Sequence, residues 1–310
     1  MSPLIIVLGP QRFHPDVVDA MTSLGVGERV AAVTAGWQER ESEVEELHEH
    51  LHVEVVELEL YRRYDEVLEA DGKLFAALRR RQDRLRRLQA LYRKRLGHHL
   101  EMTRTLISAQ DDDSLLEPER RDAIEDLRNL DAHHLDRIRA LNDEFDERWR
   151  PHEREAVARQ RRELAAILDG CETLLIAGGH VAVLHNRMRL FDVVSLTQGK
   201  PIVAWSAGAM VLSDRVVLFH DSPPQGPGNA EVFATGFGLC PGVVPLPHAR
   251  RRLRLDDRMR VALFARRFAP SRPVVLEEGT RLDWDGHRWD AAPGTSWLGA
   301  NGAIETVGGP

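Results

Sequence analysis

Ser206 is the residue whose surroundings most clearly predict chemistry. It follows a short apolar run, Ile202–Trp205, and precedes the small residues Ala-Gly-Ala at 207–209. This order is typical of a buried strand that turns sharply into a helix, with a serine at the corner. There the hydroxyl projects above the sheet, and the next backbone N–H points at the group that the serine attacks. The stretch therefore predicts a nucleophile elbow.

An alternative interpretation of the same ten residues is structural. A serine before Ala-Gly-Ala can simply cap a helix that packs tightly on its strand. Ala204 also stands at the first position of the G-x-S-x-G pattern, where alanine is the smallest replacement for glycine. Two further segments favour the nucleophile, because they offer groups that a reactive serine requires.

Gly178 and Gly179 form the first of these segments. They end an apolar run at 173–177 and precede a stretch with helical periodicity at 180–190. A glycine pair at the end of a parallel strand lets the backbone approach a ligand, and its N–H can point at a developing oxyanion. A plain strand-to-helix turn is the alternative. Because ligands gather outside the carboxyl ends of parallel strands, we expect Gly179 to serve the same site as Ser206.

The second segment that favours a nucleophilic serine contains His248. This histidine follows the apolar run 242–247, is held by Pro245 and Pro247, and precedes a helical stretch at 250–268. Histidine titrates near neutral pH, so it can take a proton from a serine and return it. Alone, it would be interpreted as structural. With a serine elbow upstream, we expect it to be the general base.

The elements around these residues predict an α/β fold. Residues 4–60 alternate short apolar runs with amphipathic stretches, and the same alternation resumes near residue 173. Such alternation indicates a doubly wound, mostly parallel sheet with helices on both faces. Near the C-terminus we expect a strand at 273–277, a tight hairpin at Asp285-Gly286, and an edge near Trp297 and Ile304. We expect these segments to seal the sheet and to carry no chemistry.

The stretch 61–166 interrupts this alternation. Its apolar residues recur at steps of three, four or seven, and a polar break at 111–114 divides it into two long helical segments. This periodicity predicts an antiparallel, coiled-coil-like helical hairpin inserted into a catalytic domain made of 1–60 and 167–310. At 1.5 Å per residue the first arm would reach roughly 70 Å.

The first arm has a basic face that invites interpretation as a nucleic-acid surface. Apolar residues interrupt this face at core spacing, and the second arm is acidic, so we expect a solvated, ion-paired face. The basic residues are Arg79, Arg80, Arg81, Arg84, Arg86, Arg87, Arg93, Lys94 and Arg95.

Two histidine pairs would lie level with each other in this hairpin. They are His98 with His99 and His133 with His134, and Glu101 and Asp131 lie nearby in the sequence. Because adjacent residues on a helix point in different directions, we do not expect the four imidazoles to form a metal site.

Composition limits the class of protein. A chain of 310 residues with 43% hydrophobic content can bury one large core or two modest ones. The net charge of −7 argues against general nucleic-acid binding, and no apolar run is long enough to span a membrane. The start reads as a first strand without a signal peptide, so we expect a cytoplasmic location. Cys171 and Cys240 lack metal-ligand spacing and are expected to be reduced, packed thiols.

Taken together, the glycine pair, the Trp-Ser-Ala-Gly-Ala run at 205–209 and the Pro-His pair at 247–248 resemble the serine peptidases related to aspartyl dipeptidase (peptidase E) and cyanophycinase. These belong to the class I glutamine-amidotransferase-like superfamily, in which the elbow more often carries cysteine. The resemblance covers residues 173–279 well and 4–60 weakly, and it excludes the hairpin.

The resemblance implies a role for five residues. Ser206 matches the nucleophile and His248 the base, while Gly179 and Ala207 match the oxyanion donors. Asp221, fifteen residues after Ser206, matches the acid that orients the histidine. The alternatives for that acid are Asp214 and Glu231.

Substrate choice depends on an arginine cluster. Family members often act near aspartate, and Arg250 and Arg251, with Arg252 and Arg254 beyond them, follow His248 closely enough to clamp a substrate carboxylate. The alternative is a solvated basic helix start that Asp256 and Asp257 balance.

Two functions are compatible with these patterns. The first is a serine peptidase that cuts small or acidic peptides through an acyl-enzyme, and the second is a non-catalytic binding or assembly protein that oligomerises through the hairpin. We favour the first, because elbow, glycine pair and histidine all fall where one site would need them. Neither requires a cofactor, and the helical arm predicts a homodimer or homo-oligomer.

Overall fold

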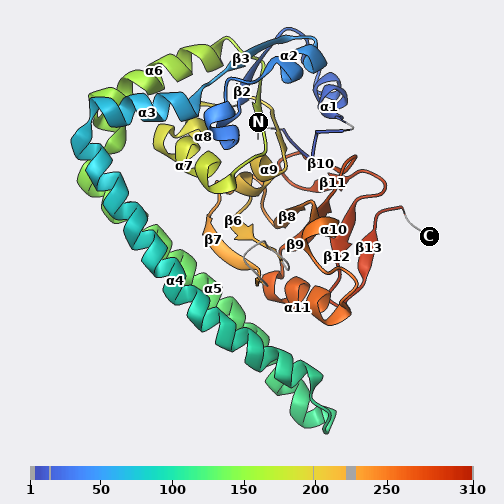
Figure 1. Cartoon of the computed structure of the whole chain (residues 1–310). Coiled ribbons are helices and arrows are strands. Elements are labelled where there is room, and N and C mark those ends of the chain that lie inside the picture. The colour runs from blue at the N-terminus through green and yellow to red at the C-terminus, as the bar shows by residue number, and fades with distance from the viewer. Residues whose placement is uncertain (1–3, 14, 198, 221–227, 309–310) are drawn as a thin grey trace.

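The computed structural model describes residues 4–308, except 14, 198 and 221–227, and comprises a layered α/β body with a long helical arm (Figure 1). Within the described residues the main sheet has seven strands in the order β11-β10-β1-β5-β4-β2-β3. They are β1 (Ile5–Leu8), β2 (Arg29–Val33), β3 (Glu54–Glu57), β4 (Thr173–Ile176), β5 (Ile202–Trp205), β10 (Arg281–Trp284) and β11 (Trp289–Ala291). The five neighbouring strands β1, β5, β4, β2 and β3 pair in parallel, and β10 and β11 add an antiparallel edge beside β1.

Helices cover both faces of this sheet. Successive residues of β1 point to opposite sides: Ile5 and Val7 join one core cluster, whereas Ile6 and Leu8 join the other. A strand that is buried on both faces has apolar residues at successive positions. This explains why polar and apolar residues do not alternate along β1, β4 and β5. One face carries α1 (Val17–Ser23) and α2 (Glu45–Leu51), and the other carries α3 (Leu60–Ala70), α6 (Glu155–Asp169), α7 (Val181–Phe191), α8 (Val193–Leu196) and α9 (Ala207–Leu212). The expected doubly wound α/β fold is confirmed.

The C-terminal half departs from the expectation that its last strands seal the main sheet. Among the strands that the structure describes after residue 270, β10 and β11 alone join the main sheet. The others form a second sheet with β8, in the order β13-β12-β9-β8, and within it β8 and β9 pair in parallel. Pro245 and Pro247 have no N–H to donate, so β8 suits an edge position. These strands are β8 (Val243–Pro247), β9 (Arg272–Leu276), β12 (Ser296–Leu298) and β13 (Ile304–Thr306), and they flank α10 (Ala249–Arg252) and α11 (Arg258–Phe268).

A third, separate ribbon joins β6 (Arg215–Leu218) and β7 (Glu231–Thr235) in antiparallel register. One side of this ribbon packs beneath the helical arm, since its apolar residues share a core cluster with Tyr92, Leu96 and Leu127 of the arm. The ribbon therefore lies between the arm and the body.

The arm is the antiparallel hairpin that the sequence predicts. It consists of α4 (Gly72–Ser108) and α5 (Asp113–Trp149), and its tip extends beyond α11 (Figure 1). Each helix has 37 residues, or about 55 Å. The arm is shorter than expected because α3 is a separate helix: Asp71 breaks the periodicity and accepts a hydrogen bond from the Leu74 N–H as the cap of α4. No helix in the described ranges is long and apolar enough to cross a membrane.

Candidate active site

Ser206 stands at the corner between β5 and α9. Its backbone has φ 52° and ψ −117°, a conformation that strains a residue with a side chain and that recurs at functional turns. The turn is tight because α9 lies against β4: a Cβ added at Gly208 would come within 2.2 Å of the Ile176 carbonyl oxygen. The sharp, strained corner is the geometry that a nucleophile elbow requires.

Glycines bring the end of β4 against this corner. A Cβ at Gly178 would lie 2.9 Å from the Cβ of Ser206 and 3.6 Å from the Ala207 nitrogen. Gly179 has φ +109°, and a Cβ there would lie 2.3 Å from the carbonyl oxygen of Gly36. Each added side chain would collide with a neighbouring backbone or with Ser206, so this layer of the site requires glycine.

The backbone N–H groups of Gly179 and Ala207 donate no hydrogen bond to any acceptor among the described residues. By contrast, the neighbouring His180 N–H donates to the Gly36 carbonyl at 2.7 Å. Two unengaged N–H groups on adjacent turns, beside a serine hydroxyl, can bind an oxyanion that forms next to that hydroxyl.

His248 occupies the corresponding position after β8. It is half-buried, adopts φ 56° as the residue that precedes α10, and is anchored by its N–H to the Leu276 carbonyl at 3.0 Å. Ser206, Gly179 and His248 line one pocket of about 920 Å³. The Ser206 hydroxyl and the His248 ring make no direct hydrogen bond, and such contacts often form only with substrate bound.

The surroundings of His248 lower its pKa below the usual 6.5. Burial is the main cause, and the positive charges of Arg252 and Arg251 act in the same direction, while Glu277 and Glu278 oppose them. The lowered pKa favours the neutral imidazole, which is the form in which a general base acts.

The three acids considered for the third member differ in position. Asp221 lies outside the described residues. Asp214 precedes β6, at the end of that strand opposite to the pocket, and accepts a hydrogen bond from the Gly242 N–H at 3.1 Å. Glu231 pairs with Arg93 of the arm. Two other acids, Glu277 and Glu278, raise the pKa of His248, and Glu278 also lines the pocket.

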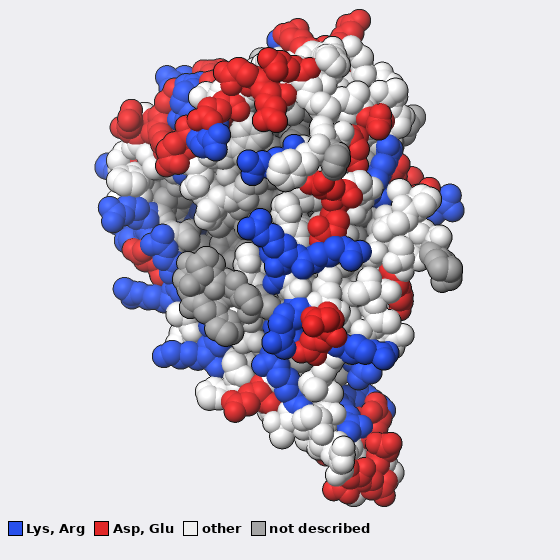
Figure 2. Space-filling model, turned by 45° about the vertical axis from the view of Figure 1, so that its right-hand side comes forward, with Lys and Arg blue, Asp and Glu red and all other residues white. Residues whose placement is uncertain are grey.

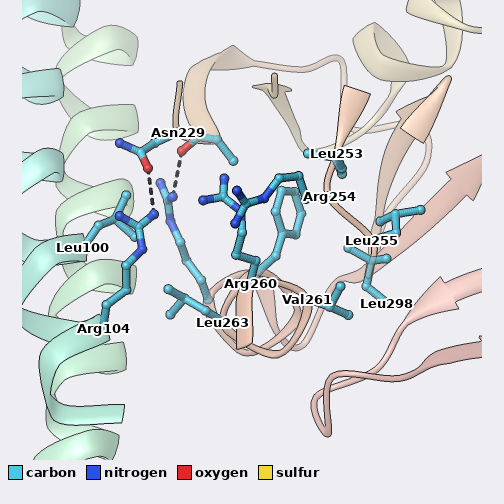
Figure 3. Close-up of a pocket in the computed structure, with 13 residues that line it drawn as sticks. Leu100, Arg104, Asn229, Leu253, Arg254, Leu255, Arg260, Val261, Leu263 and Leu298 are labelled. Carbon is cyan, nitrogen blue, oxygen red and sulfur yellow. Dashed lines mark hydrogen bonds between the residues drawn. The ribbon is translucent and has the colours of Figure 1, made fainter. Parts of the chain in front are cut away.

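The arginines expected to clamp a substrate carboxylate do not all line the pocket of Ser206 and His248. Arg251 lines the pocket together with Arg252 and with Arg12 from the β1 end. Arg250 does not line it, and the Arg250 N–H donates to Glu277 at 2.7 Å. Arg254 lines a different pocket, of about 50 Å³, between α4 and α11 (Figure 3).

Several pocket residues escaped the sequence analysis. They follow the carboxyl ends of three strands: Trp37 after β2, His180 after β4 and Glu278 after β9. Glu278 belongs to the C-terminal segments that were expected to carry no chemistry, and it lines the pocket of Ser206 and His248. The rule that ligands gather beyond the strand ends, applied to every strand, would have found all three.

The four histidines of the arm do not come together as a set of metal ligands. The described residues contain no group of three or more His, Cys, Asp or Glu that could hold one. His134 instead stacks on Tyr92 with ring centroids 4.0 Å apart, and its Nε2 contacts the Gln89 side-chain oxygen at 2.8 Å.

Charged side chains of both signs are interspersed on the body face that Figure 2 shows, and acidic ones gather at the tip of the arm. Along the arm, Arg84 pairs with Glu144 and Arg86 with Asp83. These pairs agree with the expected solvated, ion-paired face.

The fold and the site define a class: an α/β body with a serine elbow beyond its sheet and an inserted helical hairpin. Solved structures include similar proteins. A peptidase from an acI-B1 Actinobacterium aligns over 99% of this chain and 94% of its own, with a TM-score of 0.50 and 14% identity. A protein described as a candidate peptidase E, from Listeria monocytogenes EGD-e, aligns over 94% and 98%, with a TM-score of 0.45 and 10% identity.

No family model matches the chain, and no curated protein matches it. The likeness to the actinobacterial peptidase is one of fold, and it extends over the arm as well as the body because almost the whole of both chains aligns. At the level of the fold, the resemblance to peptidases is confirmed.

Proposed function

We propose that this protein is a serine hydrolase of the peptidase type that acts on small or acidic peptides. The observation that carries the proposal is the strained Ser206 corner, which lies in one pocket with His248 and beside two backbone N–H groups that have no acceptor among the described residues. Backbone strain of this kind costs about 1–3 kcal/mol and persists where function requires it.

The chemistry follows from these positions. His248 accepts the hydroxyl proton as Ser206 Oγ attacks the peptide carbonyl, and the oxyanion binds the N–H groups of Gly179 and Ala207. The C–N bond then breaks, His248 returns the proton to the leaving amine, and an acyl-enzyme ester remains. Water, deprotonated by the same imidazole, hydrolyses the ester and restores the serine.

The arginines of the pocket support an acidic substrate. Arg251 is exposed and, with Arg12 and Arg252, gives the pocket three guanidinium groups that can bind a carboxylate. We expect Arg251→Gln to raise KM for an aspartyl peptide about tenfold, since a hydrogen bond to a charged group contributes about 1.5–3 kcal/mol. KM for an uncharged peptide should stay unchanged. Steady-state hydrolysis of both peptides measures this, and an equal effect on the two would exclude the clamp.

The acid limb of the pH profile of kcat/KM should report the ionisation of His248. Because burial and two arginines lower its pKa, kcat/KM should rise to a plateau with an apparent pKa below 6.5. Arg252→Gln removes a positive charge that disfavours the imidazolium, so the limb should move to higher pH. Glu278→Gln removes an opposing negative charge, so the limb should move to lower pH. Shifts in the reverse directions would show that another group controls the limb.

The homodimer expected from the arm stays a prediction, and light scattering of the purified protein tests it.

A further inference from the structure

The arm is attached to the body by a buried polar cluster. Arg267 of α11 donates two hydrogen bonds to Asp131 of α5, both at 2.8 Å, and a third to the hydroxyl of Tyr92 of α4 at 2.8 Å. Tyr92 in turn donates to Asp131 at 2.7 Å. Arg267 and Asp131 are only 3% and 1% exposed, so these hydrogen bonds must compensate both charges for the loss of hydration.

The same cluster binds the backbone of β7 at its beginning. The Tyr92 hydroxyl accepts a hydrogen bond from the Val232 N–H at 3.1 Å, the Gln89 amide donates to the Val232 carbonyl at 3.1 Å, and Arg267 donates to the Ala230 carbonyl at 2.7 Å. Both backbone groups of Val232 thus depend on the arm.

Two side-chain contacts extend this attachment. Arg93 pairs with Glu231, and Arg104 donates to Asn229 at 2.8 Å. Figure 3 shows Arg104 reaching from α4 toward Asn229. The residues just before β7 and at its start are therefore held from the arm by side chains as well as through the backbone.

A two-stranded ribbon is marginally stable alone, and β7 pairs only with β6 within the described chain. Their register places Leu218 opposite Glu231 and Val217 opposite Val232, so the bound end of β7 faces the last residues of β6. Beyond β6 the chain enters the catalytic pocket.

Phe219 and His220 form part of the wall of that pocket. The centroid of the Phe219 ring lies 5.9 Å from the guanidinium carbon of Arg252. Among charged groups, Arg252 contributes most to lowering the pKa of His248. An unbroken series of contacts therefore runs from the arm through β7, β6 and Phe219 to the surroundings of the base.

We propose that the helical arm is a positioning element of the catalytic pocket: Tyr92 and Gln89 hold the β6–β7 ribbon so that Phe219 and Arg252 pack beside His248. The proposal rests on the proposed function for its catalytic meaning. Tyr92 and Gln89 are positioning residues and touch no substrate. In this account the insertion is a structural part of the active site, in addition to any role in assembly.

The charged groups that act on His248 come from two elements. Arg251 and Arg252 belong to α10, which His248 precedes, and Glu277 and Glu278 follow β9. The titratable His180 and His220 line the same pocket. Among these, Arg252 is the group whose guanidinium lies by the Phe219 ring, so movement of the ribbon is expected to act through Arg252.

Tyr92→Phe tests the proposal, because it removes the hydroxyl and leaves the ring that packs on His134. Thr103→Val is the matched control: it removes a fully buried hydroxyl whose acceptors among the described residues, the His99 and Ala123 carbonyls, both belong to the arm. Two measurements on full-length protein, neither of which needs catalysis, compare the variants. They are amide hydrogen exchange in β6 and the NMR titration of His248, assigned with His248→Gln.

We expect Tyr92→Phe to speed exchange at residues 216–219 by about tenfold, as for a segment that opens locally, and to raise the His248 pKa toward 6.5. Thr103→Val should change neither. Equal effects of the two variants, or an unchanged His248 titration in Tyr92→Phe, would overturn the proposal. Gln89→Met replaces Tyr92→Phe if that variant does not fold. If Ser206 proves unreactive, the proposed function is refuted. Hydrogen exchange in β6 and the titration of His248 would still decide whether the arm positions the pocket, because neither measurement needs catalysis.

Discussion

Ser206→Ala should lower kcat/KM by at least about 10³-fold, because removal of the nucleophile leaves only binding and oxyanion stabilisation. The fold should be retained, since the hydroxyl makes no hydrogen bond to another described residue. Alanine also keeps the Cβ of Ser206, which lies against Gly178. Steady-state hydrolysis of aspartyl peptides by the two purified proteins measures the loss.

Ser206→Gly provides the matched variant. It should lose activity equally, but the free energy of unfolding should rise by about 1 kcal/mol, because glycine adopts a positive φ without strain. Urea denaturation compares the three proteins. If Ser206→Ala kept more than a tenth of the activity, another residue would be the nucleophile.

Gly179→Ala should lower kcat by about 10²–10³-fold, the loss typical of one oxyanion donor. The new Cβ would lie 2.3 Å from the Gly36 carbonyl oxygen, and alanine at φ +109° is strained, so the backbone must move and take its N–H with it. KM should change less than kcat, because the oxyanion forms only in the transition state.

Gly25→Ala is the control for this change. Gly25 also has a positive φ, +69°, but an added Cβ there meets no atom within 4 Å. It should cost stability by about 1 kcal/mol and leave kcat unaltered. Equal activity of Gly179→Ala and Gly25→Ala would exclude Gly179 as an oxyanion donor.

Much of the site could be predicted from the sequence, because it is local in the chain. An apolar run that breaks into Ser-Ala-Gly-Ala specifies a strand, a corner and a helix within ten residues, and a Gly-Gly or Pro-His pair likewise marks a strand end. Since the main sheet is parallel, its strand ends meet at one edge, and Ser206 and Gly179 come together without any long-range information.

The remainder depends on contacts that the sequence does not encode locally. Arg267 and Asp131 lie far apart in the chain, and charged residues are normally solvated, so nothing marks these two as a buried pair. His134 was considered as a metal ligand with its neighbours, whereas packing places it on Tyr92. The position of β8 in a second sheet likewise follows from its pairing with β9, which periodicity does not reveal.

The proposed function requires Ser206 to be an activated nucleophile. Intact-mass analysis after treatment with a fluorophosphonate probe tests it most directly, on the wild type, Ser206→Ala and His248→Ala. We expect one adduct on the wild type, none on Ser206→Ala and a slower reaction on His248→Ala. An unmodified wild type, or an adduct that persists in Ser206→Ala, would contradict it.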